Sequence, residues 1–229
     1  MNLLTMTEPV KASAVRIVIV DDHPMVRERL AEVINREADM TVCGEAEDRA
    51  GALEMISREQ PGLAIVDLTL RRSNGLDLIK DLRAMHPEVR ILVVSMQDEN
   101  LYAERVVRAG AHGYITKQEA TRKILEAIRQ VLDGKVFLSE KLSAELLSRM
   151  VGKPKATPGS SYEMLTDREL QVFDLVGQGF GTRQIAEQLG VDVKTIETYR
   201  ARIKDKLELK DASELLRKAI AWKIDHPTT

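Results

Sequence analysis

Five side chains suited to phosphate and metal chemistry each come directly after a strand-like apolar run in the first half of the chain. They are Asp21, Asp22, Asp67, Ser95 and Lys117. The carboxyl ends of parallel strands meet along one edge of an α/β sheet, so we expect these side chains to converge in one pocket. Taken singly, each is more often ordinary turn chemistry. Their shared position at strand ends is what favours a functional site.

Three carboxylates in one pocket repel one another, and a hard divalent cation with oxygen ligands is the usual remedy. The pocket therefore predicts bound Mg2+. One carboxylate can then act as a nucleophile toward phosphorus, while the hydroxyl and the ammonium bind the phosphoryl oxygens. The chemistry predicted is phosphorylation of an aspartate. His23 adjoins the acidic pair, but we interpret it as the residue that begins a helix before Pro24, because it lacks companion nitrogen or sulfur ligands.

Strand-like and helical patterns alternate up to about residue 133, which predicts a five-stranded, largely parallel, doubly wound α/β sheet. The strand-like runs are Val15–Val20, Met40–Glu45, Leu63–Asp67, Ile91–Ser95 and Ala111–Thr116. Between them, apolar residues recur at helical spacing, as in Val26, Leu30, Val33 and Ile34.

Beyond this region the pattern becomes all-helical. A short amphipathic helix is expected over Ser139–Met150, and the segment Gly152–Ser161, rich in Pro, Gly and Ser, predicts a linker. A second, small all-α domain follows. Thr166 and Glu169 have capping-box spacing at the start of a helix, and Gly190 ends a short helix over Thr182–Leu189. A further helix from about Asp192 then completes a helix-turn-helix.

Composition sets limits on the protein class. The net charge of −2 means that DNA affinity must come from a local basic surface. The single cysteine, Cys43, excludes an intrachain disulfide framework. No apolar run reaches the length of a signal peptide core or a membrane span, so the sequence predicts a cytoplasmic protein with no membrane association.

Residues 15–135 resemble the receiver domain of two-component response regulators. The resemblance makes Asp67 the phosphate acceptor, assisted by Ser95 and Lys117. It implies Mg2+ held by Asp21, Asp22, Asp67 and the backbone carbonyl of Thr69. It also makes Ser95 and Tyr114 a switch pair, in which the aromatic ring turns inward when the hydroxyl moves toward the phosphoryl group. The segment Asp67–Gly75 resembles the acceptor and the loop after it, with Arg71 in place of the usual proline and a turn at Asn74-Gly75.

The segment Gln184–Tyr199 closely resembles the LuxR-type helix-turn-helix, so the whole chain looks like a NarL/FixJ-type response regulator. In that family, the positions of Glu197, Thr198 and Ala201 face DNA bases. The positions where phosphate contacts are expected hold Lys194, Thr195, Arg200, Arg202 and Lys204. An acidic residue at a base-reading position favours the amine of cytosine.

The expected organisation is a disordered extension at 1–14, a receiver at 15–135, a linker with a short helix at 136–161 and the DNA-binding domain at 162–229. The resemblance predicts a transcription regulator, not an enzyme with an external substrate, in which phosphorylation of Asp67 switches dimerisation and DNA binding. The implied partners are a sensor histidine kinase or a small acyl phosphate as donor, double-stranded DNA, a second copy of the chain, and RNA polymerase. We expect phosphorylation to release the second domain from the receiver.

Two other functions compete with this interpretation. A phosphohydrolase that forms an aspartyl phosphate would need a second aspartate two residues after its nucleophile, and Thr69 stands there. A DNA-binding protein that works without phosphorylation, with its receiver as a dimerisation module, would not need the complete pocket.

Overall fold

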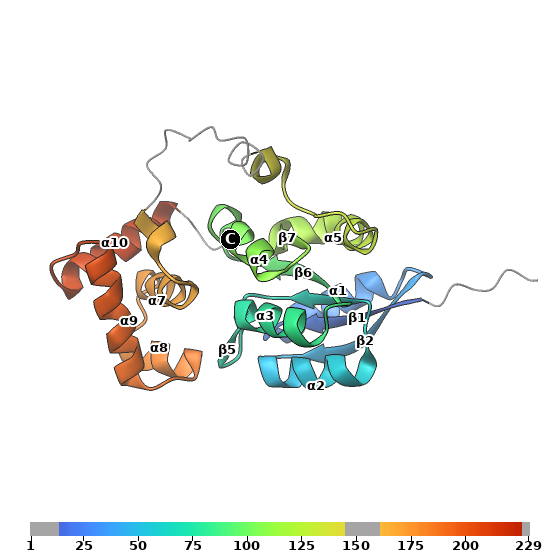
Figure 1. The fold of residues 1–229 in the computed structure, drawn as a ribbon, viewed down its shortest axis with the longest axis horizontal. Helices are drawn as coiled ribbons and strands as arrows, with labels where there is room; N and C mark the ends of the chain where they lie inside the picture. The colour runs from blue at the N-terminus through green and yellow to red at the C-terminus, as the bar shows by residue number, and fades with distance from the viewer. Residues whose placement is uncertain (1–13, 145–160, 226–229) are drawn as a thin grey trace, which may run out of the picture.

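The computed structural model describes residues 14–144 and 161–225, which form an α/β part and an all-helical part that lie against each other (Figure 1). The expected extension at 1–14 lies outside the described residues except for Ala14. Most of the expected linker does too: residues 140–144 are helical, and the description resumes at 161. No helix in these two ranges is both long and apolar enough to cross a membrane.

The first part is the predicted five-stranded parallel sheet, with strand order β2-β1-β3-β6-β7. Its strands are β1 (Val15–Val20), β2 (Met40–Ala46), β3 (Leu63–Val66), β6 (Arg90–Ser95) and β7 (Gly113–Thr116). All four residues of β3 are buried, as expected for a central strand with helices on both faces.

Five helices cover the two faces of the sheet. They are α1 (Pro24–Ile34), α2 (Arg49–Glu59), α3 (Gly75–Met85), α4 (Glu99–Ala109) and α5 (Lys117–Leu132). Side chains alternate between faces along a strand. In β1, Ile17 and Ile19 therefore pack with α1 and α5, while Val18 and Val20 pack with α2, α3 and α4.

A small hairpin between β3 and α3 was not predicted. Strand β4 (Thr69–Leu70) pairs antiparallel with β5 (Ser73–Asn74), and Arg71 and Arg72 form its tip. Arg72 has a φ of 52°, a left-handed conformation that is uncommon for a residue with a Cβ. The turn therefore lies at Arg71-Arg72 and not at Asn74-Gly75; Asn74 instead caps α3 by accepting a hydrogen bond from Leu76 N.

The second part contains a 3-10 turn, η1 (Ser161–Met164), followed by α7 (Asp167–Gly177), α8 (Thr182–Leu189), α9 (Val193–Lys206) and α10 (Ala212–Asp225). The predicted capping box is present, with Thr166 and Glu169 bonding each other's backbone. Gly190 ends α8 with a φ of 64°, which allows the tight turn into α9. Phe173 and Trp222 pack edge to face at 5.5 Å between α7 and α10.

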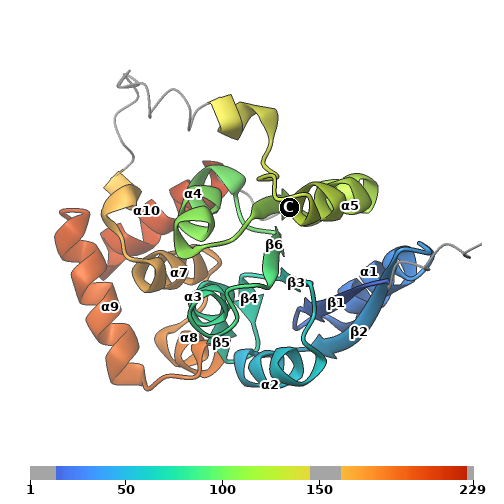
Figure 2. The same cartoon turned by 45° about the vertical axis from the view of Figure 1, so that its right-hand side comes forward.

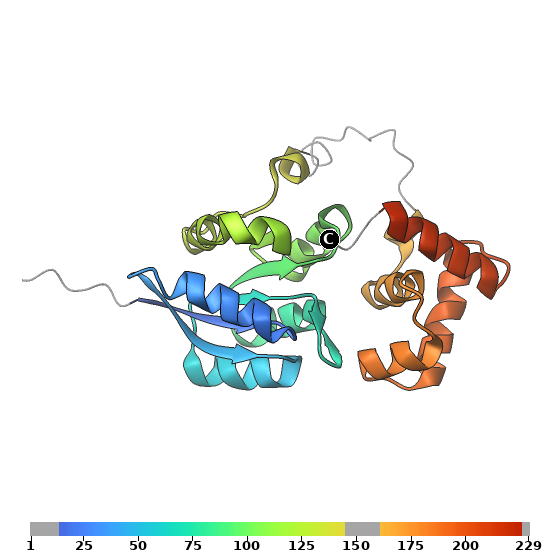
Figure 3. The same cartoon turned by 180° about the vertical axis from the view of Figure 1, so that it is seen from behind.

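Helix α7 and the turn before it face the receiver, close to α3 and α4 (Figure 2). Helix α8 lies beside the β4–β5 hairpin. Seen from behind, α10, in red, runs along the top of the helical part (Figure 3). The buried apolar cluster on the α2–α4 face of the sheet continues into the core of the helical part. The two parts therefore share apolar packing.

Candidate functional site

The structure brings the five predicted side chains to one edge of the sheet. Asp21 and Asp22 follow β1, Asp67 follows directly after β3, Ser95 is the last residue of β6, and Lys117 begins α5 directly after β7. Asp21, Asp67 and Ser95 are buried, with exposures of 2%, 2% and 0%. Val20 and Val66, the last residues of β1 and β3, are buried. The polar side chains that follow them therefore lie in a pocket that is also largely shielded from water.

Lys117 lies between two of the carboxylates. Its Nζ is 2.6 Å from Asp21 Oδ2 and 2.8 Å from Asp67 Oδ2. Burial would lower the pKa of Lys117, but the charges and hydrogen bonds of Asp67 and Asp21 outweigh burial and raise it. Lys117 therefore stays protonated and supplies a permanent positive charge beside Asp67.

Burial raises the pKa of Asp67 to about 6. The nearby charge of Lys117 opposes this rise, and the negative charge of Asp21 adds to it. A second positive charge in the pocket would favour the ionised, nucleophilic form of Asp67.

The donor set fits a hard divalent cation. Asp21, Asp22, His23 and Asp67 each offer a ligand atom within 4.8 Å of the others. Asp67 Oδ1 is buried and accepts no hydrogen bond from any described residue. A buried carboxylate oxygen without a partner is costly, and a metal ion would satisfy it.

The backbone around Thr69 also fits a metal ligand. Gly75 N donates to Leu68 O, which makes Thr69 and Asn74 a non-hydrogen-bonded pair of the hairpin. In such a pair the carbonyl points away from the partner strand. The carbonyl of Thr69 is therefore not used by the hairpin and can serve the pocket.

His23 lies closer to the pocket than the sequence interpretation implied. It is the N-cap residue of α1, as expected, but its Nδ1 is 2.7 Å from Asp22 Oδ1 and 3.2 Å from Asp21 Oδ1. Its side chain is 62% exposed. The adjacency to two aspartates in sequence was the signal for this contact.

The ring of Tyr114 is already fully buried in this structure, and its hydroxyl donates a hydrogen bond of 2.6 Å to Gln97 O. The ring therefore lies inside the receiver in the state described, and its turn in response to Ser95 stays a prediction. Gln97 lies two residues after Ser95, and its own N–H donates to Ser95 Oγ at 3.4 Å. Gln97 cannot be predicted from the sequence, because the acceptor is its backbone carbonyl and every residue type has one.

Helix α9 carries the predicted DNA-contacting residues on its exposed side. Exposed residues of this set are Lys194, Glu197, Thr198, Ala201 and Arg202. Thr195, Arg200 and Lys204 are half-buried. The hydroxyl of Thr195 donates to Asp192, the N-cap of α9, and Arg200 Nη1 donates to Thr182 Oγ1 at 3.2 Å. Thr195 and Arg200 therefore also brace the helix-turn-helix, and Asp192 and Thr182 are partners that the sequence did not reveal.

Helices α7 and α8 lie between α9 and the receiver, so the receiver does not cover the exposed side of α9 (Figures 1 and 2). The docking surface consists of α7, the turn before it and the end of α8. The residues expected to read DNA are therefore exposed to solvent while the two parts are docked.

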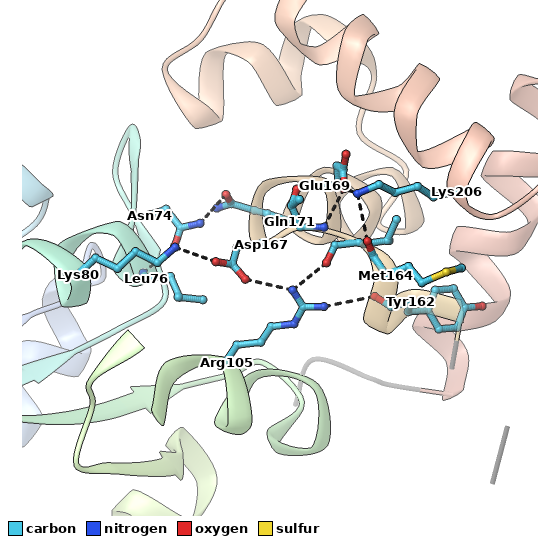
Figure 4. Close-up of polar contacts among 12 residues, drawn as sticks. Asn74, Leu76, Lys80, Arg105, Tyr162, Met164, Asp167, Glu169, Gln171 and Lys206 are labelled. Carbon is cyan, nitrogen blue, oxygen red and sulfur yellow. Dashed lines mark hydrogen bonds and ion pairs between the residues drawn. The ribbon is translucent and has the colours of Figure 1, made fainter. Parts of the chain in front are cut away.

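Charged groups make several of the contacts between the two parts (Figure 4). Asp167, the first residue of α7, accepts from Arg105 Nη1 at 3.0 Å and from Lys80 Nζ at 2.9 Å. Arg105 also donates to the carbonyls of Leu165 and Tyr162. Burial would raise the pKa of Asp167, but the hydrogen bonds from Lys80 and Arg105 outweigh burial and lower it. Asp167 therefore joins α3 and α4 of the receiver to α7.

Comparison with protein-family models divides the chain as the fold does. The response regulator receiver domain matches residues 17–129. The family of bacterial regulatory proteins called the luxR family matches residues 163–219.

Curated relatives match across most of both chains. The oxygen regulatory protein NreC of Staphylococcus haemolyticus is 33% identical over 213 residues, which are 91% of this chain and 98% of that protein. NreC of Staphylococcus carnosus is 32% identical with the same coverage.

Solved structures show the same folds. A LuxR-family two-component response regulator from Aurantimonas sp. SI85-9A1 is 32% identical, with a TM-score of 0.56 over 61% of this chain and 99% of its own. RcsB of Salmonella enterica serovar Typhimurium, solved bound to promoter rprA, is 24% identical with a TM-score of 0.63, covering 90% of this chain and 98% of its own. The RcsB likeness establishes the fold alone.

A receiver sheet followed by a LuxR-type helix-turn-helix defines a two-component response regulator. The chain belongs to the NarL/FixJ family of these regulators and is a DNA-binding transcription regulator of a two-component system. The fold class and function predicted from the sequence are thereby confirmed.

Proposed function

We propose that phosphorylation of Asp67 switches this transcription regulator. The observation that carries the proposal is the buried Asp67 carboxylate, whose Oδ1 lacks a hydrogen-bond partner among the described residues while Lys117 holds its Oδ2. A nucleophilic oxygen next to a fixed cation is suited to attack on phosphorus.

In the proposed reaction, an oxygen of Asp67 attacks the phosphorus of a phosphohistidine or a small acyl phosphate. The P–N or P–O bond of the donor breaks, and its electron pair leaves with the donor. Asp21, Asp22, Asp67 and the carbonyl of Thr69 would hold Mg2+, which offsets the charge of the phosphoryl oxygens. Lys117 and Ser95 bind those oxygens in the product. The phosphoryl group stays on the protein, so the domain acts as a switch and turns over no external substrate.

Ser95 and Tyr114 are proposed to couple this site to the rest of the receiver. Movement of Ser95 toward the phosphoryl group would shift the following residues, including Gln97, whose carbonyl holds the Tyr114 hydroxyl. Phosphorylation adds about −1.5 to −2 of charge, which is enough to favour such a rearrangement.

The regulated step is proposed to be pairing of DNA-binding domains. Release of the domain is not needed to expose α9, so we propose that release from the receiver serves to free the domain for pairing. Helix α10 places Leu215, Ala219 and Trp222 inward, whereas Leu216, Ile220 and Ile224 form an exposed apolar stripe. A stripe with four-residue spacing fits a second copy of α10.

The proposed partners follow from these surfaces: double-stranded DNA at α9, a second copy of the chain at α10, a sensor histidine kinase as phosphoryl donor, and RNA polymerase at the promoter. A regulator that binds the bacterial chromosome acts in the cytoplasm. Glu197, Thr198 and Ala201 are proposed to read bases, and the basic residues of α9 to contact phosphates.

Intact-mass measurement tests the phosphorylation step. The full chain, incubated with a small acyl phosphate and Mg2+, should gain the mass of one phosphate, and Asp67→Asn should gain none. An unchanged gain in the variant would exclude Asp67 as the acceptor. No gain in the wild-type chain would favour the phosphorylation-independent alternative.

A further inference from the structure

The β4–β5 hairpin links the pocket to the DNA-binding domain by a very short path. It begins two residues after Asp67, and each of its strands has only two residues. Isolated two-stranded hairpins are marginally stable in water. A left-handed conformation at Arg72 adds to the cost of this geometry. The hairpin must therefore take its conformation from contacts with its neighbours.

One neighbour is the loop before α2. Arg71 N donates to Glu47 O at 3.1 Å, and Arg71 Nη1 pairs with Glu47 Oε1 at 2.8 Å. Both groups of the ion pair are largely exposed, so this pair contributes little. The Glu47 contacts hold the tip of the hairpin, while Arg49 N donates to Ser73 Oγ at 3.2 Å and the buried side chain of Leu70 belongs to the apolar core.

The other neighbour is the DNA-binding domain. Asn74 pairs with Thr69 across the hairpin, and both polar atoms of its side chain make hydrogen bonds. Its Oδ1 accepts from Leu76 N at 2.7 Å, and its Nδ2 donates to Gln171 Oε1 on α7 at 3.0 Å. Asn74 is only 5% exposed, so this hydrogen bond is shielded from water.

The end of α8 also packs against the tip of the hairpin. A Cβ added at Gly190, at the end of α8, would lie 3.0 Å from Arg72 O. Two separate elements of the DNA-binding domain, α7 and the end of α8, therefore touch a hairpin of six residues. The same six residues include Thr69, whose carbonyl is free of the hairpin pairing.

From these contacts we infer that Gln171 is a positioning residue for the receiver's metal site: docking of the DNA-binding domain through Asn74 fixes the hairpin and so presents the Thr69 carbonyl to Mg2+. The inference rests on the proposed function, because it takes the Mg2+ site from there. Docking and Mg2+ binding are then thermodynamically linked, and each strengthens the other by the same factor.

Docking should strengthen Mg2+ binding because it preorganises the hairpin. With the domain docked, the Thr69 carbonyl is held where the hairpin contacts place it; with the domain undocked, part of the Mg2+ binding free energy is spent on ordering the hairpin. Loss of the Gln171 contact should therefore weaken Mg2+ binding. The regulator senses through this hairpin whether its DNA-binding domain is docked.

Two substitutions at one position separate the hydrogen bond from the shape of the side chain. Gln171→Leu keeps the size but removes the acceptor, whereas Gln171→Glu keeps an acceptor for Asn74 and for Arg168, which also donates to Gln171 Oε1 at 3.1 Å. Gln188→Leu, on the exposed side of α8, is the matched control. All are made in the full chain, and Mg2+ affinity is measured by calorimetric titration without any phosphoryl donor.

Gln171→Leu should raise the Kd for Mg2+ about two- to tenfold, the factor that one neutral hydrogen bond supplies. Gln171→Glu and Gln188→Leu should stay within about twofold of wild type. Equal Kd values for wild type and Gln171→Leu would overturn the inference and leave the proposed function standing. A wild-type chain that binds no Mg2+ would overturn the metal site in the proposed function, and the inference with it.

Discussion

Lys117 donates a hydrogen bond of 2.8 Å to Asp67, the carboxylate proposed to accept the phosphoryl group. The same ammonium contacts Asp21 at 2.6 Å, and its side chain is only 10% exposed. One cation thus balances two buried acids, so the unphosphorylated pocket depends on Lys117 for stability as well as for chemistry.

Removing that cation should destabilise the metal-free protein. With EDTA present, Lys117→Met should lower the free energy of unfolding by about 3 kcal/mol, because breaking a buried ion pair leaves uncompensated charge. Urea unfolding followed by circular dichroism measures the change. Lys123→Met is the control, since Lys123 is largely exposed and lies 3.8 Å from Glu119; it should change stability by less than about 0.5 kcal/mol. Equal effects of the two substitutions would contradict the role assigned to Lys117.

Docking of the two domains should depend on the ionised form of Asp167. Its pKa in the folded chain lies below the ordinary value of 3.8, so the contribution to docking is complete above that value and is lost as the pH falls below it. Docking should therefore be unchanged between pH 7 and pH 5.

Asp167→Asn should mimic the loss of that charge at neutral pH. Small-angle X-ray scattering should then show a larger radius of gyration, whereas Asp205→Asn, on the exposed side of α9, should leave it as in wild type. A compact Asp167→Asn protein would show that apolar packing alone holds the domains together.

The recognition helix should divide by role. Arg202→Ala should weaken binding to all DNA sequences and reduce the salt dependence of binding by about one ion. Arg202 is a cleaner probe than Arg200, because Arg200 also braces Thr182. Glu197→Ala should instead relax the sequence preference, which selection from a random DNA pool will measure. The same selected motif in wild type and Glu197→Ala would exclude base reading by Glu197.

Pairing through α10 should fail when its apolar stripe becomes charged. Ile220 is 41% exposed, so Ile220→Glu should alter stability by no more than about 0.5 kcal/mol while preventing dimers of the phosphorylated chain. Sedimentation velocity measures the association. Ile220→Val keeps the stripe apolar and should pair as wild type does. Normal dimers of Ile220→Glu would place the pairing surface elsewhere.

The sequence predicts those features that have a local pattern. The central strand β3 is a continuous apolar run followed by Asp67, and the capping box is marked by Glu169 three residues after Thr166. Both features are present as expected. The β4–β5 hairpin could not be predicted, because strands of two residues show no periodicity and Arg71-Arg72 is not a turn dipeptide.

Domain docking is also beyond the reach of sequence patterns. Arg105 and Asp167 are separated by 62 residues and look like ordinary surface charges on two helices. Only the placement of α7 against α4 reveals their contact. The hydroxyl of the buried Tyr114 likewise donates to a backbone carbonyl, that of Gln97, which carries no residue-type signal.

The central claim is that phosphorylation of Asp67 promotes pairing on DNA and does not uncover α9. The most direct test is the affinity of the full chain for DNA with one half-site and with two, with and without a small acyl phosphate and Mg2+. Phosphorylation should tighten binding to the two-half-site DNA by about 5–150-fold, the usual range of such couplings, and leave the single half-site unchanged. Asp67→Asn should show no tightening on either DNA. Equal tightening on both DNAs would contradict the account, because it would mean that the receiver masks α9 in the resting protein.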